Sequence, residues 1–318
     1  MPDIIKVSAN DDGMRLDKWF KKNRPEISYV LVQKLLRKGA IKLDGKKAKG
    51  EKKITKGQEI RIPDIDDLAP KKEKKNPATE QDAKNNLIKN IIYEDKNIFA
   101  INKPPGLPSQ GGTKVKISVD DMLEYLQEGE KPKLVHRIDK DTSGVMLLAK
   151  NKQAAQKMTA GFKDKDFKKI YWAVVVGTPD RKEGIIDLPI LAKSSDGKIE
   201  KSIIDDDGKK SITYYKVIES AAKELSWVAM MPVTGRMHQL RVHMEAIGHP
   251  ILGDGKYGGR EAFIDGLSKK MHLHARSIMS PFFSKGIITA PIPKHMKDTF
   301  KLFGFDENIE ENPFEGLD

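Results

Sequence analysis

A polar cluster directly followed by an apolar run stands in the stretch LVHRIDKDTSGVMLLAK, residues 134–150. The apolar residues 145–149 predict a buried strand. The polar cluster before them, which includes the acids Asp139 and Asp141 and a Thr-Ser-Gly turn, must then lie at a strand edge or at the mouth of a cleft. Reactive side chains in such a place can meet a substrate, and several kinds of chemistry could use them.

The composition limits the classes of protein to which the chain can belong. The chain has 318 residues, enough for two domains, and its 38% of hydrophobic residues suffice for a real core. Because there is no cysteine, disulfides, thiolate nucleophiles and cysteine-ligated zinc are excluded. The N-terminus shows no signal peptide, and no apolar run is long enough to span a bilayer. We therefore expect a soluble, cytoplasmic protein, with no sign of a membrane anchor or of an obligate protein partner.

Positive charge is concentrated near the N-terminus. Of the formal net charge of +12, residues 11–62 carry +9, from 16 Lys and Arg against 7 Asp and Glu. Residues 303–318, in contrast, contain six acids and no base. A basic patch confined to one module indicates phosphate binding, and hence a nucleic acid, more than general solubility. The competing explanation, a lysine-rich genome, would spread the charge along the chain.

The sequence pattern divides the chain into four parts. Residues 11–64 predict a small α/β module with short strands and two helices, the first with Leu16, Trp19 and Phe20 at helical spacing and the second starting at Ser28. Residues 65–86, which are polar and interrupted by prolines, predict a flexible linker. Residues 87–301 predict a larger domain, and residues 302–318 an acidic tail. In the small module, the residues expected to contact RNA phosphates are Arg15, Lys34, Arg37, Lys38 and Lys42.

The larger domain contains many predicted strands and few helices. Strand patterns include residues 168–177 and 224–235, and helical patterns include residues 152–162 and 236–248. Strands do not alternate regularly with helices as they would in a parallel α/β fold. We therefore expect an α+β fold built on a mixed, mostly antiparallel sheet.

Several familiar motifs are incomplete. GDGKYG, residues 253–258, matches G-x-G-x-x-G, but no strand precedes it and no apolar helix follows, so a dinucleotide site is rejected. The histidine spacings do not match a zinc site. Ser143 lacks the G-x-S-x-G elbow of a serine hydrolase. The sequence thus predicts no cofactor site and no metal site.

Acids and arginines remain as candidates for chemistry. Asp139 follows Arg137 closely, and Arg236 and Arg241 lie in a later helical pattern. A neighbouring arginine keeps a carboxylate ionised, and an ionised carboxylate in a cleft suits nucleophilic or general-base catalysis. A purely structural ion pair explains the same pattern equally well, so these residues alone do not name a reaction.

Three stretches resemble successive signatures of the RluA-type pseudouridine synthases: HRIDKDTSGVMLLAKN, KKIYWAVVVG and VTGRMHQLRVHMEAIGHPILGDGKYG. The small module resembles the S-four RNA-binding domain that many of these enzymes carry, and INKPPGLPSQGG fits the entry to their catalytic domain. The resemblance covers nearly the whole chain after the first ten residues, except the linker and the acidic tail. Several long motifs in the right order make it specific.

The resemblance implies roles for individual residues. It makes Asp139 the catalytic aspartate, Tyr171 the tyrosine that stacks on the uracil, and Arg241 the ion-pair partner of the aspartate. Arg137 matches the arginine that enters the RNA stack where the target base leaves. Further contacts with the substrate RNA are expected from His136 and Arg236.

The reaction implied is the isomerisation of uridine to pseudouridine in structured RNA, with an aspartate and without metal or cofactor. The target base would be flipped into the pocket, where Asp139 would either attack the glycosidic carbon or remove a ribose proton. Ile138 stands where the family usually has leucine, an apolar exchange that leaves the roles intact. The small module and the GG loop most resemble the RluC-like branch, which modifies large-subunit (23S) ribosomal RNA.

Three other functions stay open at this point. A non-catalytic RNA-binding or ribosome-assembly factor would keep the fold and the basic module without needing Asp139. A synthase acting on transfer RNA would share the same motifs. An RNA methyltransferase would need a glycine-rich cofactor loop after a first strand, and the sequence has no such loop there.

Overall fold

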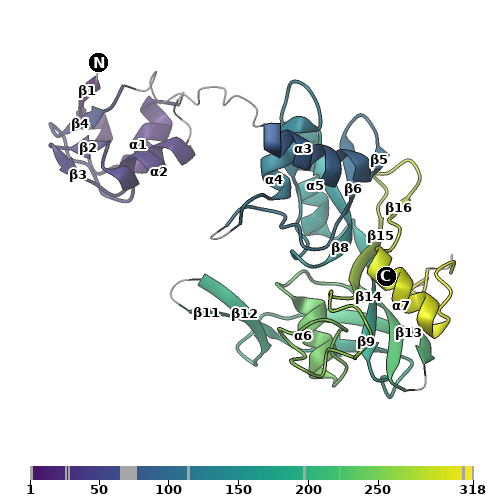
Figure 1. Cartoon of the computed structure of the whole chain (residues 1–318). Coiled ribbons are helices and arrows are strands. Elements are labelled where there is room, and N and C mark those ends of the chain that lie inside the picture. Colours follow the sequence, from purple (N-terminus) through teal and green to yellow (C-terminus); the bar gives the residue numbers. More distant parts are fainter. Residues whose placement is uncertain are drawn as a thin grey trace. The chain divides into compact units, whose positions relative to one another are not determined.

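The computed structural model describes residues 3–25, 27, 29–64, 77–112, 115–195, 198–221, 223–309 and 312–316. The chain divides into two compact units, Met1–Lys74 and Lys75–Asp318 (Figure 1). Most of the expected linker, residues 65–76, lies outside the described residues, and so does Ser28, the expected start of a helix.

The N-terminal unit packs two helices against a small sheet with the strand order β1-β4-β2-β3. Leu16, Trp19 and Phe20 are buried along one face of the first helix, as their spacing predicts. The first strand begins at Asp3, so the unit starts earlier than the sequence pattern indicates. Its elements are β1 (Asp3–Lys6), η1 (Ala9–Asp11), α1 (Leu16–Asn23), α2 (Tyr29–Lys38), β2 (Lys42–Leu43), β3 (Lys46–Lys47) and β4 (Glu59–Ile62).

The second unit contains a large sheet with helices on both faces. Its strands are β5 (Ile91–Glu94), β6 (Ile98–Lys103), β7 (Lys133–Leu134), β8 (Ser143–Ala149), β9 (Lys168–Val176), β10 (Glu183–Asp187), β11 (Ile190–Ser195), β12 (Lys198–Ile204), β13 (Ile212–Ala221), β14 (Leu225–Pro232), β15 (Leu273–Met279) and β16 (Ile287–Thr289). Its helices are α3 (Pro77–Asn86), η2 (Ile88–Asn90), α4 (Val119–Met122), η3 (Leu123–Tyr125), α5 (Lys152–Asp164), α6 (Gln239–Ala246) and α7 (Lys294–Phe303).

The sheet has the order β10-β13-β14-β9-β15-β8-β6-β5, with β7 beside β8, β16 beside β15, and a separate hairpin β11–β12. Among the strand pairs of the described residues, β8 and β15 are parallel and the others are antiparallel. The α+β fold with a mostly antiparallel sheet is therefore confirmed. The parallel pair lies in the middle of the sheet, so the loop that enters β8 opens near its centre.

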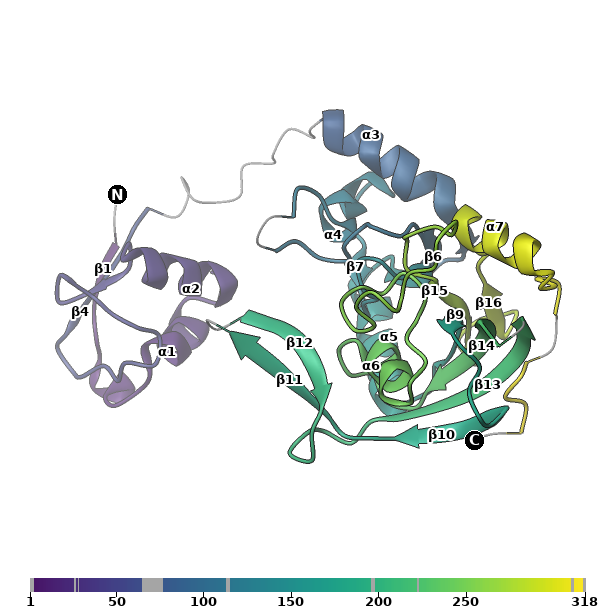
Figure 2. The same cartoon turned by 60° about the horizontal axis from the view of Figure 1, so that its bottom comes forward.

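Successive side chains of a strand point to opposite faces of the sheet and pack against the helices that cover each face. Along β9, Trp172 stacks with Phe300 of α7, whereas the next residue, Ala173, points to the other face and belongs to the buried cluster that contains Met244 of α6. Figure 2 shows the positions of β9, α6 and α7. All residues of β8 are buried, as predicted for residues 145–149. Within the described ranges, no helix is long and apolar enough to cross a membrane.

Two predicted boundaries differ from the structure. Residues 77–86 were expected in the linker but form α3, which buries Ala83 against Met122. The expected tail also packs back, since Phe305 and Phe314 are buried in the cluster beneath α7. In both segments a few apolar side chains among many polar ones provide the contact, and average composition hides them.

Candidate active site

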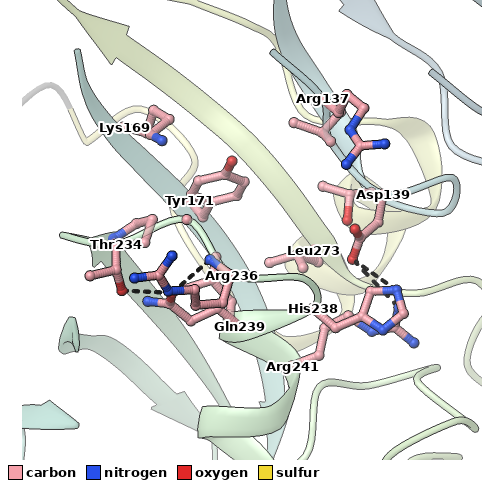
Figure 3. A pocket seen from close by; sticks show the side chains of 15 residues that line it. Arg137, Asp139, Lys169, Tyr171, Thr234, Arg236, His238, Gln239, Arg241 and Leu273 are labelled. Carbon is pink, nitrogen blue, oxygen red and sulfur yellow. Dashed lines mark hydrogen bonds and ion pairs between the residues drawn. The ribbon is translucent and has the colours of Figure 1, made fainter. Parts of the chain in front are cut away.

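A cavity of about 120 Å³ opens between the loop that precedes β8, strand β9 and the loop that leads into α6 (Figure 3). It is lined by five of the residues that the sequence predicts, which come from three distant parts of the chain. They are Arg137, Asp139, Tyr171, Arg236 and Arg241.

The Asp139 loop is held by buried polar groups. The Asp139 carbonyl accepts the N–H of Thr142 at 3.2 Å, which closes the predicted turn. The next carbonyl, of Lys140, accepts the Gly106 N–H at 2.9 Å and the ammonium of Lys103 at 3.0 Å. Lys103 is fully buried, and this burial lowers its pKa to about 7. The loop is therefore held by hydrogen bonds from two residues of the INKPPG stretch, residues 101–106.

The Thr-Ser-Gly turn is fixed by β15. The hydroxyl of Ser143 lies 2.8 Å from Nδ1 of His274, whose Nε2 lies 3.2 Å from the carbonyl of Ala290. Burial lowers the pKa of His274 to about 3, so the ring is neutral, Nε2–H donates to that carbonyl, and Nδ1 accepts from the serine. Gly144 has φ +112°, and a Cβ there would come within 2.2 Å of the Ala275 oxygen. Only glycine fits at this point of the turn.

Arg241 and His238 face the carboxylate of Asp139 (Figure 3). Nη1 of Arg241 lies 3.5 Å and Nε2 of His238 3.8 Å from Oδ2 of Asp139. The closest partner of Arg241 is Asp254, which accepts from Nε and Nη2 at 2.7 Å each. Arg241 is thus an ion-pair partner of Asp139, as the resemblance implies, but Asp254 fixes its orientation.

Sequence reasoning missed Asp254 and His238. Asp254 belongs to GDGKYG, the stretch that was rejected as a dinucleotide site, and it lines an adjoining cavity of about 630 Å³ together with Asp139, His238 and Arg241. Gly253 in that stretch has φ +80°, and a Cβ would lie 2.2 Å from the Lys270 oxygen. The signal was present, since both residues lie within the third family signature, but an acid and a histidine there do not by themselves indicate a role.

Tyr171 and Lys169 stand on β9, across the cavity from Arg137 and Asp139 (Figure 3). Burial, and to a lesser extent the charge of Asp139, raises the pKa of Tyr171, so the phenol stays protonated at neutral pH. Burial also lowers the pKa of Lys169, which sequence reasoning did not single out. The side of the cavity formed by β9 therefore offers an aromatic ring and a lysine side chain.

A wider cleft of about 700 Å³ adjoins this cavity. Arg137 and Arg236 line it with exposed side chains, and Arg137 donates to Gln110 at 3.2 Å. His136 also lines the cleft, but its Nε2 accepts the Leu147 N–H at 2.8 Å. Burial lowers the pKa of His136 to about 3, so its neutral ring supports β8, and its expected RNA contact stays a prediction.

The N-terminal unit has a groove of its own, about 670 Å³ in volume. Arg15 and Arg37 line it together with the exposed ring of Tyr29. The other three expected contacts are described but lie outside this lining; they are Lys34, Lys38 and Lys42. Among the described residues, no group of three or more His, Cys, Asp or Glu could hold a metal ion.

Comparison with known proteins gives consistent matches. Residues 97–246 match the family model described as RNA pseudouridylate synthase. The chain is 42% identical over 271 residues to "Ribosomal large subunit pseudouridine synthase C" of Rickettsia bellii, across 83% of this chain and 89% of the relative. A protein of the same name from Vibrio cholerae is 32% identical over 301 residues, across 92% and 94% of the two chains. Among solved structures, "Human RNA Pseudouridylate Synthase Domain Containing 4" is similar with a TM-score of 0.60 and 29% identity, across 71% of this chain and 97% of that one.

Proposed function

Since the chain belongs to the RNA pseudouridylate synthase family and is therefore an isomerase that acts on RNA, we propose that its substrate is large-subunit ribosomal RNA and that Asp139 is the reacting carboxylate. One observation carries the proposal for Asp139: it lies in the cavity beside Arg241 and His238, within 4 Å of both. The names of the bacterial relatives support the ribosomal target.

The proposed reaction moves the glycosidic bond of a uridine. The bond between C1′ and N1 breaks, the freed uracil rotates, and a bond forms between C1′ and C5. The C5 proton then leaves and N1 gains a proton, so the product is an isomer of the substrate. Asp139 either forms a transient ester at C1′ or removes the C2′ proton, and both routes need it ionised at the start. Arg241, whose guanidinium is always charged, supports that form.

The cavity and the cleft have complementary tasks in this proposal. The target base leaves the RNA stack and enters the cavity, where the protonated Tyr171 offers a face for stacking. Arg137 and Arg236, exposed in the cleft, contact the RNA strand on either side of the extruded base. The basic N-terminal unit binds structured RNA through its phosphates. A ribosomal RNA substrate places the enzyme in the cytoplasm.

The test uses unmodified large-subunit ribosomal RNA with purified protein, a chelator and no added cofactor. Carbodiimide labelling read by primer extension maps any pseudouridine formed. Asp139→Ala should abolish formation and leave the Kd for RNA near that of the wild type. Asp141→Asn, which removes an exposed carboxylate two residues further on, is the matched control and should keep most of the activity.

The outcomes separate the alternatives. Product from Asp139→Ala would contradict the role of this residue. If the wild type modifies transfer RNA but not ribosomal RNA, the substrate proposal is wrong while the role of Asp139 stands. RNA binding without any product from the wild type would favour the non-catalytic binding factor.

A further inference from the structure

His238 lies next to the proposed reacting carboxylate, with a constrained backbone. It precedes α6 and has φ 57° and ψ 20°, a left-handed conformation that is uncommon for residues other than glycine. Its carbonyl accepts the N–H groups of Arg241 and Val242 at 3.0 Å each. The start of the helix thereby fixes the direction of the imidazole, whose Nε2 approaches Asp139 to 3.8 Å (Figure 3).

The other ring nitrogen of His238 is held by a tyrosine. Nδ1 lies 2.7 Å from the hydroxyl of Tyr257, and the same hydroxyl oxygen accepts the backbone N–H of Ser202 at 3.1 Å. Burial raises the pKa of Tyr257, so the hydroxyl keeps its proton at neutral pH. That proton is directed to Nδ1, because the Ser202 group is itself a donor. A neutral imidazole that accepts at Nδ1 carries its own proton on Nε2.

The tyrosine is in turn held by hairpin β11–β12, which projects from the unit beside α6 (Figure 2). Ser202 of β12 also donates its hydroxyl to the carbonyl of Met237 at 2.8 Å, the residue next to the histidine. At the base of the hairpin, Ile190 packs with Tyr257 and with Val242 of α6. The hairpin therefore supports both the tyrosine and the backbone that carries the imidazole.

The charges around His238 favour its neutral form. Burial has the largest effect and lowers its pKa. Asp139 and Asp254 raise the pKa, Arg241 and Lys256 lower it, and the net change is downward. At neutral pH the ring is thus a neutral hydrogen-bond donor, and Arg241 supplies the positive charge.

We infer that Tyr257 and hairpin β11–β12 position the catalytic centre by holding His238 in the tautomer whose Nε2–H faces Asp139. The separation of 3.8 Å exceeds the length of a hydrogen bond, but catalytic hydrogen bonds are often long in the free enzyme and shorten when substrate binds. The donated N–H would orient the carboxylate without adding a charge. The effect on the rate rests on the proposed role of Asp139, whereas the tautomer is a property of the free protein.

The tautomer can be read from long-range ¹H–¹⁵N spectra of the full chain labelled with ¹⁵N-histidine, at neutral pH and without RNA. The chain has seven histidines, and His238→Gln identifies the signals of this one. We expect a protonated Nε2 and an unprotonated Nδ1 in the wild type, and a mixture of tautomers in Tyr257→Phe. Tyr93→Phe, whose hydroxyl bonds to Asp95 and Ser284, is the matched control and should leave the His238 signals unchanged.

Kinetics separate positioning from a general structural role. Tyr257→Phe should lower the single-turnover rate constant about fivefold, the loss of one neutral hydrogen bond, with the Kd for RNA unchanged. His238→Ala, which removes a donor to a carboxylate, should lower it about 10- to 100-fold. His238→Gln, which keeps a side-chain N–H, should lose less than His238→Ala.

Two results would overturn the inference: a protonated Nδ1 in the wild type, or a wild-type rate in His238→Ala. If Tyr257→Phe does not fold, the tautomer of the wild type and the rates of His238→Ala and His238→Gln still test the inference. If the wild type forms no pseudouridine on any RNA, the proposed function fails, but the tautomer measurement keeps its meaning.

Discussion

Two arginine–aspartate pairs with nearly the same geometry lie in the two units of the chain. Arg241 donates to Asp254 at 2.7 Å through both Nε and Nη2, and Arg15 donates to Asp17 at 3.1 and 2.7 Å through the same atoms. The exposed fractions of the arginine side chains differ, however, at 8% for Arg241 and 46% for Arg15. Water can replace a lost partner of Arg15 but not of Arg241. Loss of the aspartate should therefore lower the free energy of unfolding more at Arg241 than at Arg15.

The difference extends to the surroundings of each pair. In the second unit, Lys75–Asp318, which carries the site and is called the catalytic unit from here on, three buried groups hold or face the loop that carries Asp139. They are Lys103, His274 and Arg241. In the N-terminal unit, the cations expected to bind RNA are mostly exposed and act separately. Changes in the first region should therefore affect stability and chemistry together, whereas changes in the second should weaken RNA binding by small, salt-dependent steps.

The largest expected effect comes from removing the buried partner. Asp254→Asn leaves the guanidinium of Arg241 buried without its closest anion, which should destabilise the catalytic unit by about 3 kcal/mol and lower the rate, because Arg241 also faces Asp139. Asp17→Asn is the matched control, and its effect should be much smaller, since water reaches Arg15.

Urea unfolding followed by tryptophan fluorescence can test this prediction for each unit. The chain has three tryptophans: Trp19 reports on the N-terminal unit, and Trp172 and Trp227 report on the catalytic unit. Single-tryptophan variants would separate the two transitions. Equal losses of stability in the two Asp→Asn variants would contradict the comparison.

A second pair of sites compares two glycines with positive φ. A Cβ at Gly144 would meet the Ala275 oxygen at 2.2 Å, whereas a Cβ at Gly13 in the N-terminal unit would meet nothing within 4 Å. Gly13→Ala should cost only the conformational penalty, about 1–2 kcal/mol. Gly144→Ala must also push β8 from β15, so we expect a loss above about 3 kcal/mol and a displaced Asp139. The unfolding midpoint of each unit checks both values, and a similar loss at the two glycines would show that the contact with β15 relaxes freely.

The sequence located the site in the stretch where a hydrophobic pattern and reactive side chains occur together. The buried strand at residues 145–149 and the place of Asp139 at the mouth of a cleft followed from the apolar run and the polar cluster. The catalytic role of Asp139 is implied only by the family resemblance and stays a proposal. Asp254 and Tyr257 could not be found in this way, because their roles depend on a close approach of segments far apart in the chain. The glycine-rich stretch around them was recognisable, but the partner of its acid was not.

The same limit applies to the domain boundaries. Helix α3 was hidden because its sequence is polar: among its described side chains only Ala83 is buried, and Leu87, directly after the helix, is buried in the same cluster. The packing of Phe305 and Phe314 beneath α7 was hidden by the acids around them. Hydrophobic periodicity reveals a buried face made of several apolar residues, but it cannot reveal a packing contact made by only one or two.

The pH dependence of stability should also differ between the units. Burial lowers the pKa of His274 to about 3 and that of His272 to about 4, from an ordinary value of 6.5. Because these folded-state pKa values lie below the unfolded ones, the neutral rings contribute full stability above pH 6.5 and lose it as the pH falls toward 4. For each ring, the free energy of unfolding should fall by about 1.4 kcal/mol for every pH unit below 6.5 in this window.

The N-terminal unit contains no histidine and should respond at lower pH. Hydrogen bonds from Lys22 and Arg15 lower the pKa of Asp11 and Asp17 respectively. Carboxylates of this kind stabilise the fold above their unfolded pKa of about 4 and lose that contribution only as the pH falls further. Urea midpoints measured between pH 7 and pH 5 should therefore fall for the catalytic unit and stay nearly constant for the N-terminal unit. Parallel declines would contradict the assignment to buried histidines.

The smallest expected effect is on the N-terminal surface, where two neighbouring cations can be compared. Arg37 lines the groove beside Tyr29 and Lys38 does not, although both are exposed at the end of α2. If the groove is where RNA binds, Arg37→Ala should weaken binding about two- to fivefold and reduce the slope of log Kd against log salt by about 1. Lys38→Ala should change both quantities less, and neither variant should alter the single-turnover rate at saturating RNA. Equal effects of the two would favour the end of the helix over the groove as the contact, because charge alone would then decide.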